Sequence, residues 1–284
     1  MPLLKLKEYR RPASVEEAAA LLRRKSPRTA VLAGGTWLNG QSHTDVEAAV
    51  DIAGLGLNRL ELSGAPARLH IGAAVTLQRL IDELPAASGL EILPATAHAM
   101  AGMNIRNQAT IGGSIATTDS SSPLATALLA CNAELKLYTT EERTLSLSAF
   151  LSYRQSILAD GALIKAVEIT VPSPDTYSAY ERVARTPSDY PIVCAAASCA
   201  IKDGVAGNVR VAIGGVAAFP IRLTHLELAL EKKQVLSALD SALQDAIAPL
   251  TPLDDWLGSS AYRKEMARTL ARRAIISAAR LTDS

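Results

Sequence analysis

A glycine pair stands near the end of the stretch Ile105-Arg106-Asn107-Gln108-Ala109-Thr110-Ile111-Gly112-Gly113-Ser114, directly after residues 109–111, a short run typical of a strand. A second pair follows a similar run in Val31-Leu32-Ala33-Gly34-Gly35-Thr36. Consecutive glycines let the backbone turn tightly and approach a ligand closely, with N–H groups directed at an anion. Each loop also carries a hydroxyl group, so together they favour a pyrophosphate held without a fixed positive charge. The alternative is a pair of tight turns that bind nothing.

Three other glycine-loop motifs are incomplete. Residues 35–42 nearly match the phosphate-binding loop of NTPases, but Gln41 stands where the lysine that reaches the phosphates is required. The dinucleotide fingerprint fails because Arg59 takes the place of its third glycine. A nucleophile elbow would need glycine at Ala116. The sequence therefore favours neither an NTPase, nor a Rossmann domain, nor a serine hydrolase.

The composition is that of an ordinary globular protein, with 284 residues, 49% hydrophobic and 20% charged. At roughly 150 residues per domain, this length predicts about two domains. A net charge of +1 does not favour nucleic-acid binding. The longest apolar run, residues 191–201, is shorter than the ~20 residues of a membrane span. No apolar signal segment opens the sequence, so we expect a cytoplasmic protein that does not enter a membrane.

The cysteines and histidines do not predict a metal centre. Cys131, Cys194 and Cys199 form no C-x-x-C pair and are too few for an iron–sulfur cluster held by this chain alone. All three stand in apolar segments, which predicts buried, unreactive thiols. Metal-ligand spacing is also missing from the four histidines, which are His43, His70, His98 and His225.

Helix and strand signals alternate over the first 170 residues. Ser14 and Glu17 form a capping box that predicts a helix to about Arg24. Further helices are expected after Thr76 and from Pro123. The predicted strands of this part are 29–33, 48–52, 59–62, 68–71, 134–138 and 163–171.

A change of pattern follows Pro172 and Pro174, which mark a linker because proline interrupts both helix and sheet. Strands come first, and helices follow them, which is typical of an α+β domain. The predicted strands are 177–184, 192–202 and 208–214, and the predicted helices are 222–231, 235–247 and 261–281.

The stretch from Ile105 to Ala116, together with the Ala33-Gly34-Gly35-Thr36 turn, resembles the FAD-binding medium subunit of molybdenum hydroxylases. That family includes the FAD subunits of xanthine dehydrogenases and the medium subunit of carbon monoxide dehydrogenase. The resemblance spans nearly the whole chain, including residues 8–18, 180–182 and 262–267. It implies an α+β fold, in which a vanillyl-alcohol-oxidase-type FAD-binding region of two α+β subdomains occupies residues 1–173. A C-terminal domain of the carbon monoxide dehydrogenase flavoprotein type, with a small antiparallel sheet and helices, is implied for residues 177–284.

The resemblance also implies an FAD site without a catalytic acid or base. Ile164 matches an aliphatic residue against the isoalloxazine, and Arg182 falls near a lysine of the relatives. Met100 replaces an aromatic ring that some relatives stack on the flavin, and Tyr190 lies in a loop that approaches it. The implied cofactor-binding residues are Val31, Leu32, Ala33, Gly34, Gly35, Thr36, Trp37, Leu38, Met100, Thr110, Ile111, Gly112, Gly113, Ser114, Thr117, Ile164 and Arg182.

One departure from the family pattern concerns the segment after the second loop. Pro123 stands where relatives commonly have an aspartate that holds the ribityl and isoalloxazine end of the cofactor. Proline offers neither a side-chain acceptor nor an N–H group. Weakened flavin binding is therefore an open alternative, with Asp119 or a nearby serine as a substitute acceptor.

The function that the resemblance implies is electron transfer within an oxidoreductase complex. Electrons would pass from a molybdopterin-binding large subunit, through the [2Fe–2S] clusters of a small subunit, to FAD and then to NAD⁺ or another acceptor. Two alternatives remain open at this point. One is a noncatalytic scaffold that has lost tight flavin binding, and the other is a free-standing flavoenzyme.

Overall fold

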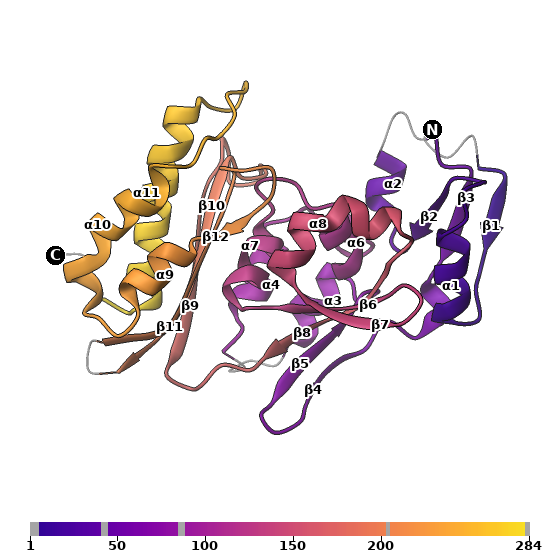
Figure 1. Ribbon diagram of the computed structural model, residues 1–284, viewed down its shortest axis with the longest axis horizontal. Coiled ribbons are helices and arrows are strands. Elements are labelled where there is room, and N and C mark those ends of the chain that lie inside the picture. The colour runs from indigo at the N-terminus through magenta and orange to yellow at the C-terminus, as the bar shows by residue number, and fades with distance from the viewer. Residues whose placement is uncertain (1–5, 41–44, 85–88, 203–204, 282–284) are drawn as a thin grey trace. The chain divides into compact units, whose positions relative to one another are not determined.

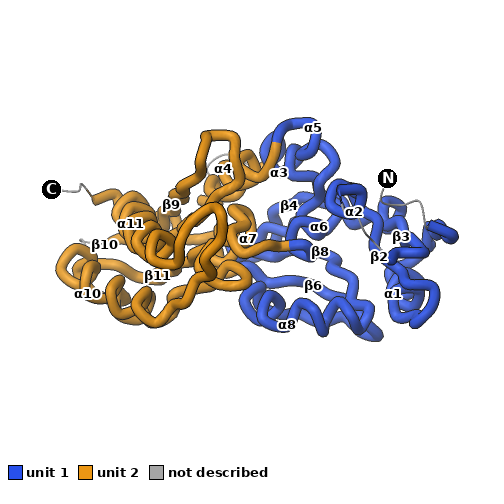
Figure 2. Tube along the Cα trace, turned by 90° about the horizontal axis from the view of Figure 1, so that it is seen from above, with its two compact units in different colours: residues 1–83, 102–117, 133–170 blue, residues 84–101, 118–132, 171–284 orange. Residues whose placement is uncertain are grey.

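The fold is described from a computed structural model, which covers residues 6–40, 45–84, 89–202 and 205–281. The chain divides into two compact units (Figure 2). Unit 1 comprises residues 1–83, 102–117 and 133–170, and unit 2 comprises residues 84–101, 118–132 and 171–284. Each unit is therefore assembled from segments that are separate in the sequence. None of the helices within the described ranges is both long and apolar enough to cross a membrane.

Unit 1 contains two sheets with helices around them (Figure 1). A parallel three-stranded sheet has the order β1-β3-β2, and an antiparallel five-stranded sheet has the order β4-β5-β8-β6-β7. Its elements are β1 (Glu8–Arg10), α1 (Val15–Leu22), β2 (Thr29–Leu32), α2 (Thr36–Gly40), β3 (Ala48–Asp51), η1 (Ala53–Leu55), β4 (Leu60–Ser63), β5 (Arg68–Gly72), α3 (Leu77–Glu83), α5 (Met103–Arg106), α6 (Ile111–Ala116), β6 (Glu134–Tyr138), β7 (Glu142–Ser146), α8 (Leu147–Ala159) and β8 (Leu163–Thr170).

The predicted capping box is present at the start of α1. Ser14 Oγ accepts a hydrogen bond from the Glu17 amide at 3.2 Å. Glu17 reaches back one residue further than in the standard box and accepts from the Ala13 amide at 2.7 Å. The helix ends at Leu22, two residues before the predicted end. The pattern assigned no element to residues 139–162, where the structure has β7 and α8.

Unit 2 is built on an antiparallel four-stranded sheet of order β12-β11-β10-β9 (Figure 1). Its elements are α4 (Ile92–His98), α7 (Pro123–Ala130), β9 (Thr176–Val183), β10 (Val193–Lys202), β11 (Val205–Gly214), β12 (Ile221–Arg222), α9 (Thr224–Leu230), α10 (Val235–Ile247) and α11 (Ser260–Ala278). The predicted strands and helices of this part are confirmed, and the bounds of α10 are those predicted.

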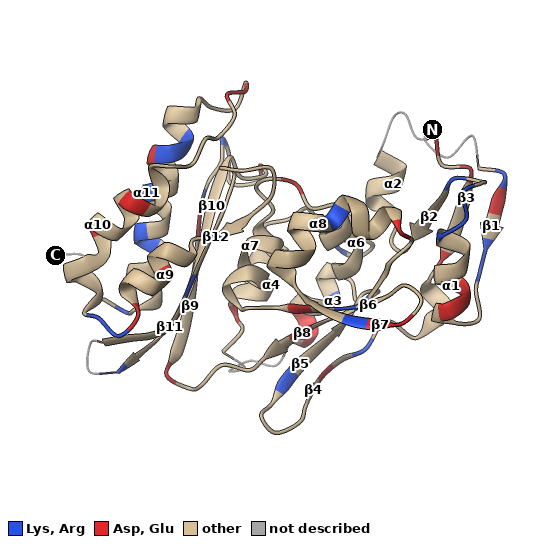
Figure 3. Cartoon of the chain, viewed as in Figure 1, with Lys and Arg blue, Asp and Glu red and all other residues tan. Residues whose placement is uncertain are grey.

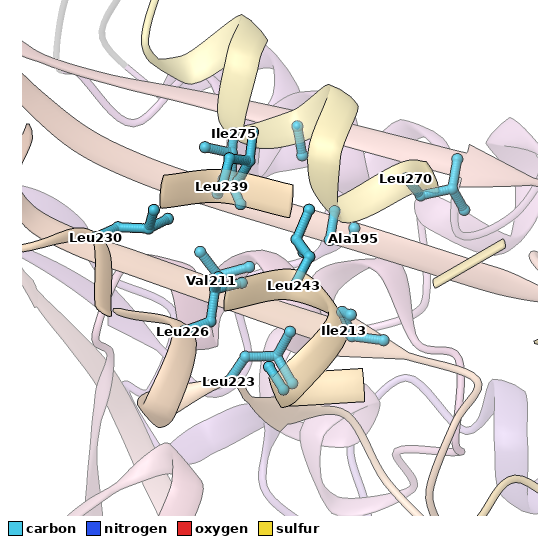
Figure 4. Close-up of a cluster of buried hydrophobic side chains, with 14 of the residues drawn as sticks. Ala195, Val211, Ile213, Leu223, Leu226, Leu230, Leu239, Leu243, Leu270 and Ile275 are labelled. Carbon is cyan, nitrogen blue, oxygen red and sulfur yellow. The ribbon is translucent and has the colours of Figure 1, made fainter. Parts of the chain in front are cut away.

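Strand β10 is covered on both faces, which explains its unbroken apolar sequence. Val193 and Ala195 belong to the hydrophobic cluster formed with α9, α10 and α11 (Figure 4). Cys194, on the opposite face, lies 3.4 Å from the hydroxyl of Thr126 in α7. The apolar run that was too short for a membrane span therefore forms an interior strand of this sheet.

The cysteines are free thiols, as the sequence predicted. Cys194 and Cys199 are buried, and Cys131 is partly buried. Burial raises the pKa of Cys131 and Cys199 to about 12 and that of Cys194 to about 11. At neutral pH the three side chains are therefore thiols, which are poor nucleophiles and metal ligands.

Asp51, at the end of β3, is a buried carboxylate that unit 1 satisfies with three donors. The Tyr9 hydroxyl and Arg11 Nε donate to Oδ2, the latter at 3.0 Å, and the Ala53 amide donates to Oδ1 at 2.9 Å. Burial acts to raise the pKa of Asp51, but these donors together hold it below its ordinary value. Its stabilising contribution is therefore complete above the unfolded pKa of about 4 and is lost as pH falls through the lower folded pKa.

We expect Asp51→Asn to lower the free energy of unfolding by about 1–3 kcal/mol at pH 7, because a neutral amide replaces a charged acceptor. The loss should shrink as pH falls below about 4, where the unfolded carboxyl is protonated, and should be smallest below the lower folded pKa, where the folded carboxyl is protonated as well. Urea unfolding between pH 7 and pH 3 measures both effects. Asp45→Asn is the control, since its exposed pair with Arg28 is worth little. An equal loss of unfolding free energy at pH 7 and at pH 3 would contradict the role assigned to the Asp51 carboxylate.

Candidate functional site

The two glycine pairs meet at one cavity of about 470 Å³, formed entirely by segments of unit 1. The first loop packs directly on the chain that leads into the second. A Cβ atom built on Gly34 would lie only 1.6 Å from the carbonyl oxygen of Gln108. Only glycine permits this approach, so the pair at 34–35 is required by the contact between the loops as well as by the turn.

The first loop joins β2 to α2. Gly35 has a φ of 69°, in the left-handed region that favours glycine, and its carbonyl accepts from the Asn39 amide at 2.8 Å. Within the described part of the chain, the amides of Gly34, Gly35 and Thr36 have no hydrogen-bond partner. This loop therefore offers backbone donors at the cavity, as the sequence predicted.

The second loop differs from the predicted turn. Gly112 and Gly113 lie in the helix α6, which Thr110 caps by accepting from the Gly113 amide at 3.1 Å. The Ile111 amide donates to Val75 O, and the Gly112 amide donates to Ala73 O, both at 2.9 Å. The amides that were expected to face an anion are thus already used. The turn prediction was wrong because the chain 73–76 supplies acceptors that the local sequence does not reveal.

The second loop contributes a close backbone packing contact and hydroxyl groups. A Cβ on Gly112 would lie 2.6 Å from that of Ala73, so this glycine is needed for packing. Gly113 lines the cavity. The atom nearest to a Cβ added there is the Thr110 hydroxyl oxygen, at 3.0 Å. Thr110 uses its oxygen as an acceptor and keeps its O–H as a donor, whereas the Thr117 hydroxyl donates to Gly113 O at 2.8 Å.

The cavity also has a charged residue that the sequence analysis missed. Arg154, on α8, is the one ionisable residue among the described lining residues. Figure 3 shows α2 and α6 without charged residues, while α8 carries a basic one. The two glycine loops themselves carry no charge, as expected, and Arg154 is a further residue of the lining. The i, i+4, i+7, i+11 spacing of Leu147, Leu151, Arg154 and Leu158 is the signal that would have placed Arg154 on the inner face of a helix.

Most of the predicted site residues line this one cavity. They are Val31, Ala33, Gly34, Gly35, Thr36, Trp37, Leu38, Thr110, Gly112, Gly113, Ser114, Thr117 and Ile164. Four of the predicted residues are not in the lining, and two of these belong to unit 1: Ile111 is fully buried, and Leu32 ends strand β2. Met100 and Arg182 belong to unit 2.

Around Met100, unit 2 gathers several polar side chains. The Tyr190 hydroxyl lies 3.8 Å and the Ser122 hydroxyl 4.0 Å from Met100 Sδ. Burial raises the pKa of Tyr190 far above its ordinary value, so this phenol is neutral. Arg182 Nη1 donates to the carbonyl of Asp189 at 2.9 Å, and Nη2 donates to that of Pro187. Arg182 therefore holds the loop that carries Tyr190.

Pro123, at the place of the family aspartate, is the first residue of α7 and is buried. Proline suits this position because its missing N–H would have no partner in the first helical turn. Ser122 caps the same helix by accepting from the Ala125 amide at 3.3 Å. Asp119 Oδ1 accepts from the Ser121 amide at 3.1 Å. Pro123 thus has a structural role at the start of a buried helix.

No group of three His, Cys, Asp or Glu side chains in the described ranges has the arrangement of a metal site. His70 Nδ1 lies 3.7 Å from the Glu168 carboxylate, on the five-stranded sheet. His43 and Gln41 lie outside the described residues, so the interpretations that concern them stay predictions.

Comparison with known proteins identifies the family of this chain. A family model described as the FAD binding domain in molybdopterin dehydrogenase matches residues 4–174, and the CO dehydrogenase flavoprotein C-terminal domain matches residues 178–278. The xanthine dehydrogenase FAD-binding subunit of Escherichia coli O157:H7 is 28% identical, with 94% of each chain covered. The carbon monoxide dehydrogenase medium chain of Afipia carboxidovorans is 29% identical, over 94% of this chain and 95% of that one.

A solved structure has the same fold. It is carbon monoxide dehydrogenase from Hydrogenophaga pseudoflava, in a form that lacks the Mo-pyranopterin moiety, and one of its chains superposes with a TM-score of 0.89 at 28% identity. The superposition covers 98% of this chain and 99% of that chain. The chain therefore belongs to the family of FAD-binding subunits of molybdopterin dehydrogenases, as a flavoprotein component of an oxidoreductase.

Proposed function

We propose that this chain carries electrons through bound FAD between an iron–sulfur partner and a soluble acceptor. The complex would also contain a molybdopterin-binding large subunit and a [2Fe–2S] small subunit. The single observation that carries the proposal is the cavity at which both glycine loops meet. When bound, FAD supplies the redox chemistry, because it accepts and releases electrons that side chains of this protein cannot.

The residues around the cavity fit a dinucleotide pyrophosphate. The amides of Gly34, Gly35 and Thr36 are donors for phosphate oxygens, and Gly113 leaves open the volume that a side chain would fill. Ile164 supplies apolar surface from β8. The role of this chain is then to bind and orient the cofactor and to exclude water from it.

Several finer points are part of the proposal. We retain the FAD-binding domain at residues 1–173 and the C-terminal domain at residues 177–284, a division that the two family matches support. Leu32, Ile111, Met100 and Arg182 stay proposed cofactor neighbours on the family resemblance alone. NAD⁺ as the acceptor and a cytoplasmic location also stay predictions.

We expect the purified chain, incubated with FAD and then freed of unbound cofactor, to show flavin absorption at about one FAD per chain. Adding NADH anaerobically and following the loss of that absorption tests the acceptor separately. Co-purification of the chain with a molybdenum-containing and an iron–sulfur subunit tests the complex. A folded, colourless protein that holds no FAD, alone or with its partner subunits, would contradict the proposal and support the noncatalytic scaffold.

A further inference from the structure

The lining of the cavity includes a large aromatic residue. Among the described lining residues, Trp37 is the one aromatic residue, and most of the others are aliphatic residues or glycines. Trp37 keeps 52% of its surface exposed, although covering so large an apolar side chain is favourable. The cavity thus has an aromatic surface that the folded chain leaves half uncovered.

The backbone that carries Trp37 is fixed on both sides of this residue. Before it, Gly34 packs so closely on Gln108 that an added Cβ atom would lie 1.6 Å from the carbonyl oxygen of Gln108. After it, Leu38 is buried in unit 1 and anchors α2. A tryptophan side chain has only two rotatable torsions, so a ligand that covers it costs little conformational entropy. Trp37 is therefore suited to contact a ligand of the cavity.

The chemistry of the proposed cofactor indicates which of its two ring systems reaches Trp37. In the proposed function, the amides of residues 34–36 bind the pyrophosphate, and Trp37 is the next residue along the chain. In FAD, a ribose separates the adenine from the pyrophosphate, whereas the longer ribityl chain separates the isoalloxazine from it. A side chain directly after the pyrophosphate loop is therefore closer to the adenine. Stacking on an aromatic side chain is a common way for proteins to bind a base.

We propose that the indole of Trp37 stacks on the adenine of the bound dinucleotide and makes the cavity prefer FAD to FMN. This inference rests on the proposed FAD site. It adds to that site a residue that recognises the adenine, because stacking covers the apolar faces of both ring systems. Trp37 is thus a binding residue, and the electron transfer itself does not require it.

The chain has two tryptophans, so substitution of one allows the fluorescence of the other to be measured alone. Trp256→Phe leaves Trp37, and Trp37→Leu leaves Trp256, which is the matched control. Trp256 belongs to unit 2, is 77% exposed with Arg185 over its ring, and is not among the described lining residues. The probe is ADP, which carries the adenine and the pyrophosphate and, unlike a flavin, does not absorb tryptophan emission. Thermal unfolding of each variant without ligand reports whether it folds.

We expect ADP to quench the emission of Trp37 in Trp256→Phe and to leave the emission of Trp256 in Trp37→Leu unchanged. In calorimetry, Trp37→Leu should bind ADP and FAD about 10-fold more weakly than the wild-type chain, as for removal of a base-stacking side chain. Trp37→Tyr keeps an aromatic ring and should keep most of the affinity. Trp256→Phe should bind both ligands like the wild-type chain.

Unchanged ADP affinity in Trp37→Leu, or unchanged emission of Trp37 at saturating ADP, would overturn the proposal. A loss of FMN affinity in Trp37→Leu as large as the loss of FAD affinity would also overturn it, because Trp37 would then contact the isoalloxazine. If Trp37→Leu fails to fold, the fluorescence of Trp256→Phe decides, since that variant retains Trp37.

The outcomes separate this inference from the proposed function. A chain that binds ADP in a Trp37-dependent way but holds no FAD would refute the flavin role and support the adenine contact. A chain that holds FAD equally well with and without the indole of Trp37 would support the flavin role and refute this inference.

Discussion

Gly113→Val should weaken FAD binding by at least about 100-fold, or about 2.7 kcal/mol, while the chain remains folded. Gly113 lines the cavity, and the nearest atom to an added Cβ is the Thr110 hydroxyl at 3.0 Å. The methyl groups of valine must therefore enter the space that the ligand needs. The backbone of α6 already has helical geometry at this position, so the folded state tolerates a side chain there.

The experiment measures retained flavin and the far-ultraviolet circular dichroism of Gly113→Val against those of Gly54→Val. Gly54 in η1 is the matched control, because a Cβ atom added there would meet nothing within 4 Å. Gly54→Val should bind FAD like the wild-type chain. Stoichiometric FAD in folded Gly113→Val would show that α6 is not a wall of the cofactor site.

Arg263→Met should lower the free energy of unfolding of unit 2 by about 2–4 kcal/mol, the range for losing two hydrogen bonds from a buried charged donor to backbone carbonyls. Arg263 on α11 is 5% exposed. Its Nη1 donates to Ile192 O at 2.8 Å and to Gly215 O at 3.1 Å, and its Nη2 donates to both carboxylate oxygens of Asp255. One side chain thereby joins the start of β10, the end of β11 and the segment before α11. Methionine leaves all these acceptors without their donor.

Hydrogen exchange of the β10 and β11 amides, together with urea unfolding, measures this loss within unit 2. Arg268→Met on the same helix is the control, because Arg268 is half-exposed and pairs with Glu265 three residues away. It should change the stability by no more than about 0.5 kcal/mol. A loss below about 1 kcal/mol for Arg263→Met would show that water replaces the guanidinium, and the proposed joining role would then be wrong.

The sequence predicted those helices and strands whose structure follows from a single local pattern. Helix α10 repeats its apolar residues at the helical period, and β10 is a long apolar run before a change of composition. Helix α8 was missed because three serines and Gln155 dilute its periodicity, so that the packing of Leu147 and Leu151 decides its structure. Arg154 was missed with it.

The sequence by itself determined the membership of this chain in an FAD-binding family, the positions of both glycine loops and the α+β character of its second half. These properties depend on neighbours along the chain, where glycine, proline and apolar periodicity act directly on the backbone. The tertiary structure alone decided that Gly112 and Gly113 form the start of a helix, and that Arg154 faces the cavity. Both depend on residues distant in sequence: the carbonyls of Ala73 and Val75 take the amides of the second loop, and packing of α8 in unit 1 turns one arginine inward.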